Sequence, residues 1–524
     1  MRKWDQKGVA LALSALLCAN LFTPITIQAK TEDEGNDYLN VEVKKEYVYH
    51  TFQLTNDPFA KYQWAFDNTG IFKYKEILPS GYYGKTIYSK AGVDIGLEKG
   101  LAYYKEHAVN RPIIVAIIDT GVDTKQEDLQ GHLWINELEK ENKKDDDANG
   151  LKDDINGWNF YDNSKYLCNY ASFDEEYQEY EDDHGTHCAG TIVATPNNGI
   201  GVAGIAGDAN VKLMIIKALG GKEGEDAGTG LTSSIVQAIN YAEKMGAQIC
   251  NLSFGGDEED PALKQVMKES NMLFICASGN DGQDTDKKPI YPASYELPNV
   301  ISVANINSDG TLAASSNYGV QSVDLAAPGS EIVSTLVGND YGRMTGTSMA
   351  APMVTSASAL LYSFYENMTA QDAKNIILNS TKKLSTLSGK VKTGGMLDIE
   401  AMLKTPYTPS TEHKETELTL SLGELEGSYG KNLNINVDSK RDLVEVRIQK
   451  GEISLEEFQK QKGGTALKLD KVQQYKIKEP GTYTVYIRDR AGIEKTETVQ
   501  ADFTIPLKAK GSTHKSKISL LKES

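Results

Sequence analysis

Short apolar runs and segments of helical period alternate along residues 111–404. The run at 111–118 is apolar at almost every position, which is typical of a strand buried on both faces of a parallel sheet. Two further apolar runs of strand length follow at 248–252 and 273–277. The pattern therefore predicts several parallel strands within one large domain.

Apolar residues recur at helical spacing between these predicted strands. After Thr232 they occupy four such positions, Ile235, Ala238, Ile239 and Ala242. We predict a helix with Thr232 as its N-cap and an end at Gly246, and a second helix at 263–270. Alternating strands and helices predict an α/β fold, a parallel sheet with helices on both faces, in which ligands bind at the carboxyl ends of the strands.

Near the C-terminus the pattern changes to strands alone. The polar segment 405–417, which contains two prolines, predicts a linker. Four later segments have the apolar runs or the alternation of strands, at 418–422, 433–437, 443–448 and 482–488. We expect an all-β module over 418–505 that resembles an immunoglobulin-like sandwich, followed by a basic tail at 506–524. Its candidate roles are cell-surface contact, polysaccharide binding, packing on the larger domain and a spacer.

The first 29 residues have the pattern of a secretory signal peptide: a basic start, an apolar stretch and the small residue Ala29 at its end. A lipoprotein signal at Cys18 is the alternative, but Leu17 is bulky where such signals carry a small residue. No later run reaches the roughly 20 apolar residues that span a bilayer. We therefore expect a secreted, extracellular protein with no membrane span.

Composition excludes some classes of function. The 524 residues carry 73 acidic and 55 basic side chains, a net charge of −18. This acid excess argues against nucleic-acid binding, which requires a cationic surface. The length suggests two or three domains. Four cysteines outside the predicted signal peptide are too few for a disulfide scaffold, and Cys188, Cys250 and Cys276 have the apolar or small neighbours of buried thiols.

Three segments carry candidate catalytic residues. Asp119 directly follows the strand predicted at 111–118, at the edge of the sheet where ligands bind. His184 stands among glycines at the start of a predicted helix, and Ser348 begins another helix that runs through Leu361. Taken singly, each has a structural alternative: a turn cap, a structural histidine and a helix N-cap.

Together these segments change the interpretation, because Asp, His and Ser follow one another in the order found in subtilisin. The chain resembles the subtilisin-like serine proteases (subtilases) over residues 56–404. The motifs that carry the resemblance are Asp119-Thr120-Gly121, His184-Gly185-Thr186-His187 and Gly346-Thr347-Ser348-Met349-Ala350, with further matches at 277–280 and 252–256. The resemblance implies a subtilisin-like fold and a serine endopeptidase.

The resemblance also implies a role for each motif residue. Ser348 would be the nucleophile that forms an acyl-enzyme, His184 its general base, and Asp119 the group that orients His184. The side chain of Asn280 and the backbone N–H of Ser348 would bind the oxyanion of the tetrahedral intermediate.

Substrate-binding segments follow from the same resemblance. A peptide or protein substrate would bind as an extended strand, and small residues would form the wall of the S1 pocket, which takes the side chain before the scissile bond. The residues implied are Ser253, Phe254, Gly255, Gly228, Gly230, Ala277 and Gly279. A plain turn is the alternative for each glycine group.

Oxygen-bearing side chains predict structural calcium at two places. By the resemblance, Asp128 and Asn198 match one family site, to which Gln63 is a loose further match. A second candidate has the spacing of an EF-hand loop, with Asn156 in place of the final Glu. Its oxygen-bearing residues are Asp145, Asp147, Asn149 and Asp153. A solvated loop is the alternative for both.

The acidic segment 174–183 directly precedes His184. A solvated surface loop is the simple interpretation, and an electrostatic preference of the cleft for basic peptides is the alternative. Residues 30–55 would form a pro- or N-terminal segment shorter than the propeptides typical of the family.

Two function classes stay open. One is an active secreted endopeptidase, either broad or specific for processing, and the other is a non-enzymatic surface protein that keeps the fold. The complete Asp119, His184 and Ser348 set, with Asn280, favours the first.

Overall fold

The computed structural model describes residues 55–174, 179–221, 228–408, 416–425, 430–461 and 463–504. The predicted signal peptide and basic tail lie outside the described residues, as do residues 30–54 and the central part of the predicted linker. The chain divides near Lys414 into two compact units, and each is described by itself.

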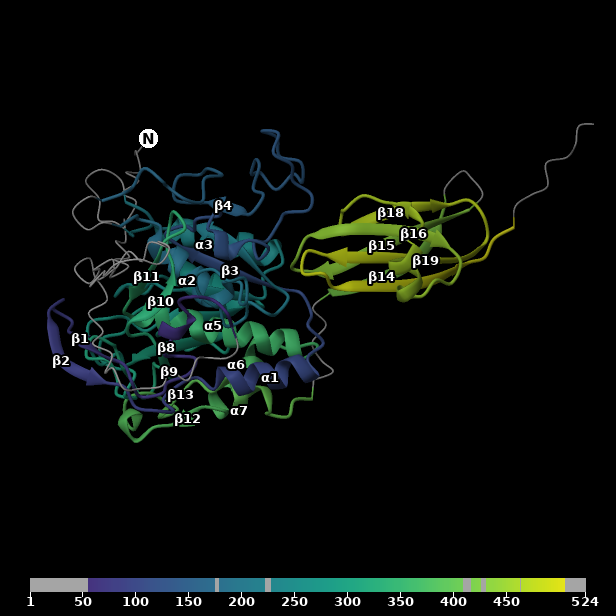
Figure 1. Ribbon diagram of the computed structural model, residues 1–524. Coiled ribbons are helices and arrows are strands. Elements are labelled where there is room, and N and C mark those ends of the chain that lie inside the picture. The colour runs from purple at the N-terminus through teal and green to yellow at the C-terminus, as the bar shows by residue number, and fades with distance from the viewer. Residues whose placement is uncertain are drawn as a thin grey trace, which may run out of the picture. The chain divides into compact units, whose positions relative to one another are not determined.

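The larger unit is built on a nine-stranded sheet in the order β12-β13-β9-β8-β7-β6-β3-β5-β4 (Figure 1). All neighbours are parallel except β12 and β13. The strands are β3 (Ile113–Asp119), β4 (Gly157–Asn159), β5 (Val211–Lys217), β6 (Ile249–Leu252), β7 (Leu273–Ala277), β8 (Val300–Ile306), β9 (Leu325–Pro328), β12 (Lys382–Lys383) and β13 (Gly395–Met396). Because β5 and β6 flank β3 on opposite sides, the chain reverses its direction of travel across the sheet at β3, where a crevice opens at the carboxyl ends.

Helices cover both faces of this sheet, as predicted. They are α1 (Leu97–His107), α2 (Asp183–Val193), α3 (Thr232–Lys244), α4 (Pro261–Glu269), α5 (Thr347–Phe364), α6 (Ala370–Asn379) and α7 (Ile399–Leu403). Val115 and Ile117 of β3 join one apolar core with α2 and α5, whereas Ala116 and Ile118 join a second core with α3 and α4. Every residue of β3 is buried, which explains its unbroken apolar run.

The predicted start of α3 was wrong by one residue. Thr232 is the first helical residue, Leu231 occupies the N-cap position, and no side chain caps the helix. In α4 the cap is Asp260, whose carboxylate accepts hydrogen bonds from the N–H groups of Ala262 and Leu263. Apolar periodicity missed Pro261 and Ala262 at the start of α4 because it locates the buried face rather than the end of a helix.

Smaller elements complete the larger unit. They are the strands β1 (Lys73–Ile77), β2 (Tyr83–Tyr88), β10 (Ile332–Thr335) and β11 (Tyr341–Met344), with the short 3-10 helices η1 (Ala60–Tyr62), η2 (Glu127–Leu129) and η3 (Ser385–Leu387). The β10–β11 hairpin packs on α2, where the Thr335 hydroxyl donates to the Thr186 carbonyl at 2.7 Å.

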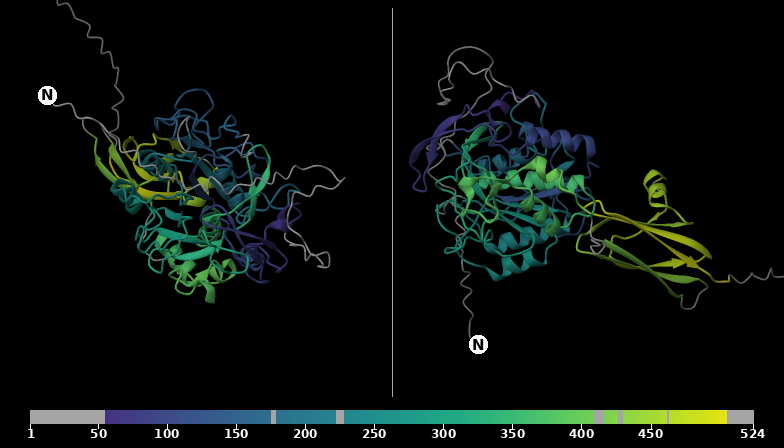
Figure 2. Two further views of the ribbon diagram at one scale, coloured as in Figure 1. Left: turned by 90° about the vertical axis from the view of Figure 1, so that its left-hand side faces the viewer. Right: turned by 90° about the horizontal axis from the view of Figure 1, so that it is seen from below.

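The smaller unit is an antiparallel β module of two sheets, in the orders β14-β15-β18 and β17-β16-β19-β20. Its elements are β14 (Thr416–Glu424), β15 (Lys431–Ser439), β16 (Leu443–Lys450), α8 (Leu455–Gln461), β17 (Thr465–Ala466), β18 (Val472–Ile477), β19 (Gly481–Asp489) and β20 (Glu494–Ala501). The strands of the module are the yellow-green part of the ribbon (Figure 2). Residues of both sheets share one core, which includes Ile435, Ile448 and Val485. This is the sandwich expected from the alternating pattern.

Strand β19 is more buried than its alternation predicts. Tyr486, expected on the solvent side, is buried and stacks on Phe458 of α8 with ring centroids 5.3 Å apart. Because a helix packs on the outer face of this strand, side chains on both faces of the strand are buried, and the sequence alternation no longer separates buried from exposed positions.

The cysteine predictions are confirmed for the described residues. Cys188, Cys250 and Cys276 are buried, Cys168 is half-buried, and all four are free thiols. Among the described helices, none combines the length and the apolarity that a bilayer crossing requires.

Candidate active site

Asp119 lies at the carboxyl end of β3, where the strand order reverses. Its Oδ1 accepts hydrogen bonds from the Thr120 N–H at 2.8 Å and from Nδ1 of His184 at 2.7 Å. Gly121 allows the turn that follows, because it has φ +123° and a Cβ there would lie 2.5 Å from the Leu167 carbonyl oxygen. The carboxylate and the imidazole are both buried, so their interaction is only weakly screened by water.

The absence of a side chain on Gly185 allows His184 to lie beside Asp119. A Cβ on Gly185 would lie 2.1 Å from the carbonyl oxygen of Gly121, so only glycine lets the first turn of α2 approach the end of β3 this closely. The second histidine of the motif has another role. His187 Nε2 bonds the Ile332 carbonyl at 2.8 Å, and burial lowers its pKa to about 3, which keeps it neutral.

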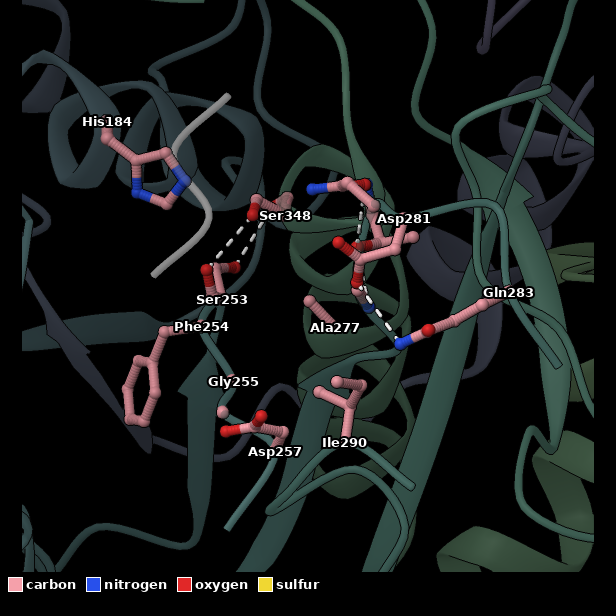
Figure 3. A pocket seen from close by; sticks show the side chains of 14 residues that line it. His184, Ser253, Phe254, Gly255, Asp257, Ala277, Asp281, Gln283, Ile290 and Ser348 are labelled. Carbon is pink, nitrogen blue, oxygen red and sulfur yellow. Dashed lines mark hydrogen bonds between the residues drawn. The ribbon is translucent and has the colours of Figure 1, made fainter. Parts of the chain in front are cut away.

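Ser348 lies in the first turn of α5 and faces the same cavity as His184 (Figure 3). Its hydroxyl donates to the Ser253 carbonyl at 3.0 Å, and the Ser253 hydroxyl donates back to the Ser348 carbonyl at 2.9 Å. The Ser348 hydroxyl is thus directed to Ser253 rather than to His184. Catalytic hydrogen bonds are often made only once substrate is bound.

Asn280 follows β7 and is held through its amide oxygen. Oδ1 accepts hydrogen bonds from the Thr347 N–H at 2.9 Å and from the Thr347 hydroxyl at 3.1 Å. With the oxygen held in this way, the amide NH₂ is the group that Asn280 offers to the cavity it lines with Ser348.

The structure brings most of the predicted substrate residues together. Ser253, Phe254, Gly255, Ala277 and Gly279 line one cavity of about 270 Å³ with His184, Asn280 and Ser348. Gly228 and Gly230 are not among its lining residues. They lie beyond the end of β5, where a Cβ on Gly230 would be 2.4 Å from the Ala218 carbonyl oxygen.

Four lining residues were missed by the sequence interpretation: Asp257, Asp281, Gln283 and Ile290. Asp257 and Asp281 stand within two residues of predicted site residues, so their adjacency could have identified them. Ile290 follows ten residues after Asn280, and no local pattern marks it as part of the cavity.

The end of the acidic segment before His184 is buried rather than solvated. Lys217, the register partner of Asp119 on β5, lies 2.7 Å from Asp182 and 3.2 Å from Glu181. Burial raises the pKa of Asp182, and Lys217 opposes this rise. The ion pairs therefore attach the segment to the sheet beside the catalytic Asp119. Residues 175–178 lie outside the described residues.

Replacing Lys217 by Met is expected to destabilise the protein by about 3–5 kcal/mol, because it leaves two buried carboxylates without their cation. Chemical denaturation of the purified protein, carried out in a Ser348→Ala background for both forms, measures the change. Lys244→Met, at an exposed position in α3, is the control and should change stability by about 0.5 kcal/mol or less. A similar small effect for Lys217→Met would contradict the expectation.

The first predicted calcium site is assembled around the fully buried Asp128. Its Oδ1 accepts from the Asn198 amide at 2.7 Å and its Oδ2 from the Val202 N–H at 2.9 Å. Burial raises the pKa of Asp128 to about 7. Gly201 leaves space for this carboxylate, since a Cβ there would lie 2.3 Å from Oδ2.

Asp57 was missed as a site residue by the sequence interpretation, and it contacts the loop that carries Asn198. Its carboxylate accepts from the N–H groups of Asn197, Asn198 and Gly199 at 2.9–3.1 Å. Gln63, the loose family match, instead bonds Ala203 through both its amide nitrogen and its amide oxygen.

The second predicted calcium site is brought together in part. Carboxylate oxygens of Asp145 and Asp147 lie within 4.8 Å of one another and of Glu139, which the sequence interpretation missed. Asn149 donates to Asp147 at 3.2 Å. Asp153 is engaged elsewhere, 3.0 Å from Lys165, and this contact lowers its pKa.

Comparison with known proteins places these features in a family. Residues 110–398 match the model of the subtilase family, Peptidase_S8. The chain is 38% identical over 259 residues to the major intracellular serine protease of Bacillus subtilis (strain 168), covering 48% of this chain and 69% of that protein. It is 33% identical over 307 residues to subtilisin-like protease 1 of Plasmodium vivax, covering 54% of this chain and 46% of that protein.

Among solved structures, a protease of Pseudoalteromonas arctica PAMC 21717 is similar at 22% identity with a TM-score of 0.48. The similarity covers 67% of this chain and 98% of that one.

Proposed function

We propose that this chain, which belongs to the subtilase family of serine proteases, is a secreted endopeptidase that cleaves peptide bonds with Ser348, His184 and Asp119. The observation that carries the proposal is the 2.7 Å hydrogen bond between buried Asp119 and His184, because His184 also lines the cavity that contains Ser348. The predicted signal peptide supports secretion, and it lies outside the described residues.

The proposed reaction begins with the attack of Ser348 Oγ on the carbonyl carbon of the scissile bond. Nε2 of His184 takes the hydroxyl proton and then delivers it to the departing amine, which leaves an acyl-enzyme. Water attacks the ester while His184 takes its proton, and His184 then gives this proton to Ser348 Oγ as the acid product leaves. Asp119 fixes the tautomer of His184 through Nδ1 and stabilises its protonated form.

The amide of Asn280 is proposed to bind the oxyanion with the backbone N–H of Ser348. Asn280→Ala is expected to lower kcat by about 10²–10³-fold with little change in KM, the loss known for the oxyanion asparagine of subtilisin itself. Steady-state kinetics on a peptide substrate measures kcat and KM of the variant. Asn280→Asp, which keeps the shape but has no NH₂, should lose as much. A loss below about threefold in both variants would remove Asn280 from the oxyanion site.

A fluorophosphonate probe tests the proposal against the non-enzymatic alternative. An activated serine attacks the phosphorus of the probe and displaces fluoride, whereas an ordinary serine does not. We expect a stable adduct at Ser348 in the purified full chain, and none in the Ser348→Ala or His184→Ala variants. No adduct in a folded wild-type protein would favour a binding protein that has retained the fold.

We also propose that calcium binds at Asp128. Subtilases commonly bind calcium, which prefers carboxylate, amide and carbonyl oxygens. Asp128, Asp57 and Asn198 carry such oxygens, and both aspartates accept hydrogen bonds from Asn198. A cation there would also favour the ionised form of Asp128, which burial disfavours.

Removal of calcium should therefore lower thermal stability. In the Ser348→Ala background, EGTA is expected to lower the melting temperature by about 5–10 °C relative to excess calcium. Asp128→Asn should remove most of this difference if this site dominates, and Asp145→Asn tests the second acidic loop in the same way. Asp208→Asn, at a surface ion pair with Lys105, is the control. A melting temperature independent of calcium would contradict the proposal.

A further inference from the structure

The cavity beside Ser348 has a closed floor. Its two walls include Ser253 to Gly256 on one side and Ala277 and Gly279 on the other, and Ile290 is a further lining residue. A Cβ on Gly255 would be 2.6 Å from Ile290 Cγ2, and a Cβ on Gly279 would be 3.5 Å from Ile290 Cγ1. The isoleucine side chain therefore reaches both walls and limits how deeply a rigid aromatic ring could enter.

Two carboxylates line the same cavity. Asp257 lies beside Ile290 at the end away from Ser348, and Asp281 lies on the wall nearer to Ser348 (Figure 3). Asp281 is oriented by hydrogen bonds that its Oδ2 accepts from Gln283 at 3.4 Å and from Asn317 at 3.3 Å. Apart from the catalytic His184, the charged side chains among the described lining residues are these two, so the cavity is anionic.

We propose that this cavity accepts a lysine or arginine side chain on the substrate residue before the scissile bond, with Asp257 and Asp281 as specificity-determining residues. The inference rests on the proposed endopeptidase function and adds a substrate class to it. The aliphatic stem of such a side chain would lie along Ile290 and Ala277, and its cationic group would reach Asp257 at the far end, while Asp281 adds negative charge nearer to Ser348. A leucine or phenylalanine would cover ionised carboxylates without neutralising them, and a glutamate would be repelled.

The shape of the cavity supports the same class of side chain. A flexible methylene chain can bend over a floor formed by Ile290, whereas a phenyl ring needs a deep slot between the two walls. Charge and shape are independent observations, and both favour a long cationic side chain.

Internally quenched peptides that differ only at the residue before the cleaved bond test the inference. We expect kcat/KM for arginine and lysine to exceed that for leucine by about tenfold or more, with glutamate lowest. Asp257→Asn and Asp281→Asn should each lower kcat/KM for arginine by about 5–20-fold while changing that for leucine by less than about twofold. Glu258→Gln removes the same charge at an exposed neighbour that does not line the cavity, and should change neither.

The role of Ile290 as the floor of the cavity is tested by a variant that should gain activity on an aromatic substrate. Ile290→Gly should raise kcat/KM for a phenylalanine peptide relative to the leucine peptide by about tenfold, because it opens the space between the walls. An unchanged ratio would show that Ile290 does not close the floor and would overturn the shape argument.

The outcomes separate this inference from the proposed function. A protein that reacts with the fluorophosphonate and cleaves the leucine peptide at least as well as the arginine peptide overturns the inference alone. Equal losses for both peptides in the aspartate variants also overturn it. A folded protein that cleaves none of the peptides and forms no adduct overturns the proposed function.

Discussion

Ser348→Ala is expected to lower kcat for peptide hydrolysis by about 10⁶-fold, the magnitude known for loss of the serine in subtilisin itself. The reason is that alanine has no oxygen to form the acyl-enzyme, so His184 and Asp119 have no nucleophile to activate. Continuous cleavage of a quenched peptide at high enzyme concentration measures the residual rate.

The control for this variant is stability, because the Ser348 hydroxyl also bonds the Ser253 carbonyl. Loss of one such hydrogen bond should cost only about 1 kcal/mol, so the variant should keep the wild-type circular dichroism spectrum. It should also keep its affinity for a non-cleavable peptide. Retention of more than about one hundredth of the wild-type rate would mean that another group is the nucleophile.

Asp119→Asn is the second large effect, an expected fall of about 10⁴-fold in kcat. The carboxylate accepts a hydrogen bond from Nδ1 of His184, which leaves Nε2 unprotonated to take the serine proton. An asparagine can instead donate to Nδ1, and that favours the tautomer with its proton on Nε2, which cannot act as a base. The change keeps the side-chain shape, so the effect isolates the charge and the direction of the hydrogen bond.

Steady-state kinetics and fluorophosphonate labelling together check this prediction. The labelling rate should fall with kcat, because both reactions require the same deprotonated serine. Asp208→Asn makes the same chemical change at a surface ion pair and should leave both rates within about twofold of wild type. If Asp119→Asn lowered kcat by less than about tenfold, His184 would be oriented by another group.

The candidate catalytic residues could be identified from the sequence because each lies in a local motif that the chemistry restricts. Asp119 ends an apolar strand, and Gly121 and Gly185 are required where two backbones approach each other. Such requirements act over a few adjacent residues, so they are visible without any knowledge of distant contacts. The buried strand β3 was predictable for the same reason, since both of its faces pack on helices.

The parts that could not be predicted depend on residues far apart in the chain. Asp57 meets Asn198 across about 140 positions, Asp153 turns away from its predicted site toward Lys165, and Lys217 buries acidic residues that a local pattern predicts to be solvated. Periodicity and composition indicate whether a segment will be buried or exposed. They do not identify which distant residue will contact it.

The sequence by itself determined the α/β architecture, the β module and the choice of Asp119, His184 and Ser348 as candidate catalytic residues. Only the tertiary structure decided how these residues are oriented and which side chains complete the cavity beside them. Ile290 closes the floor and Asp257 and Asp281 supply its charge because separate loops converge at the carboxyl ends of β6 and β7. Specificity therefore depends on the folded arrangement, since the shape and charge of a pocket are properties of several loops together.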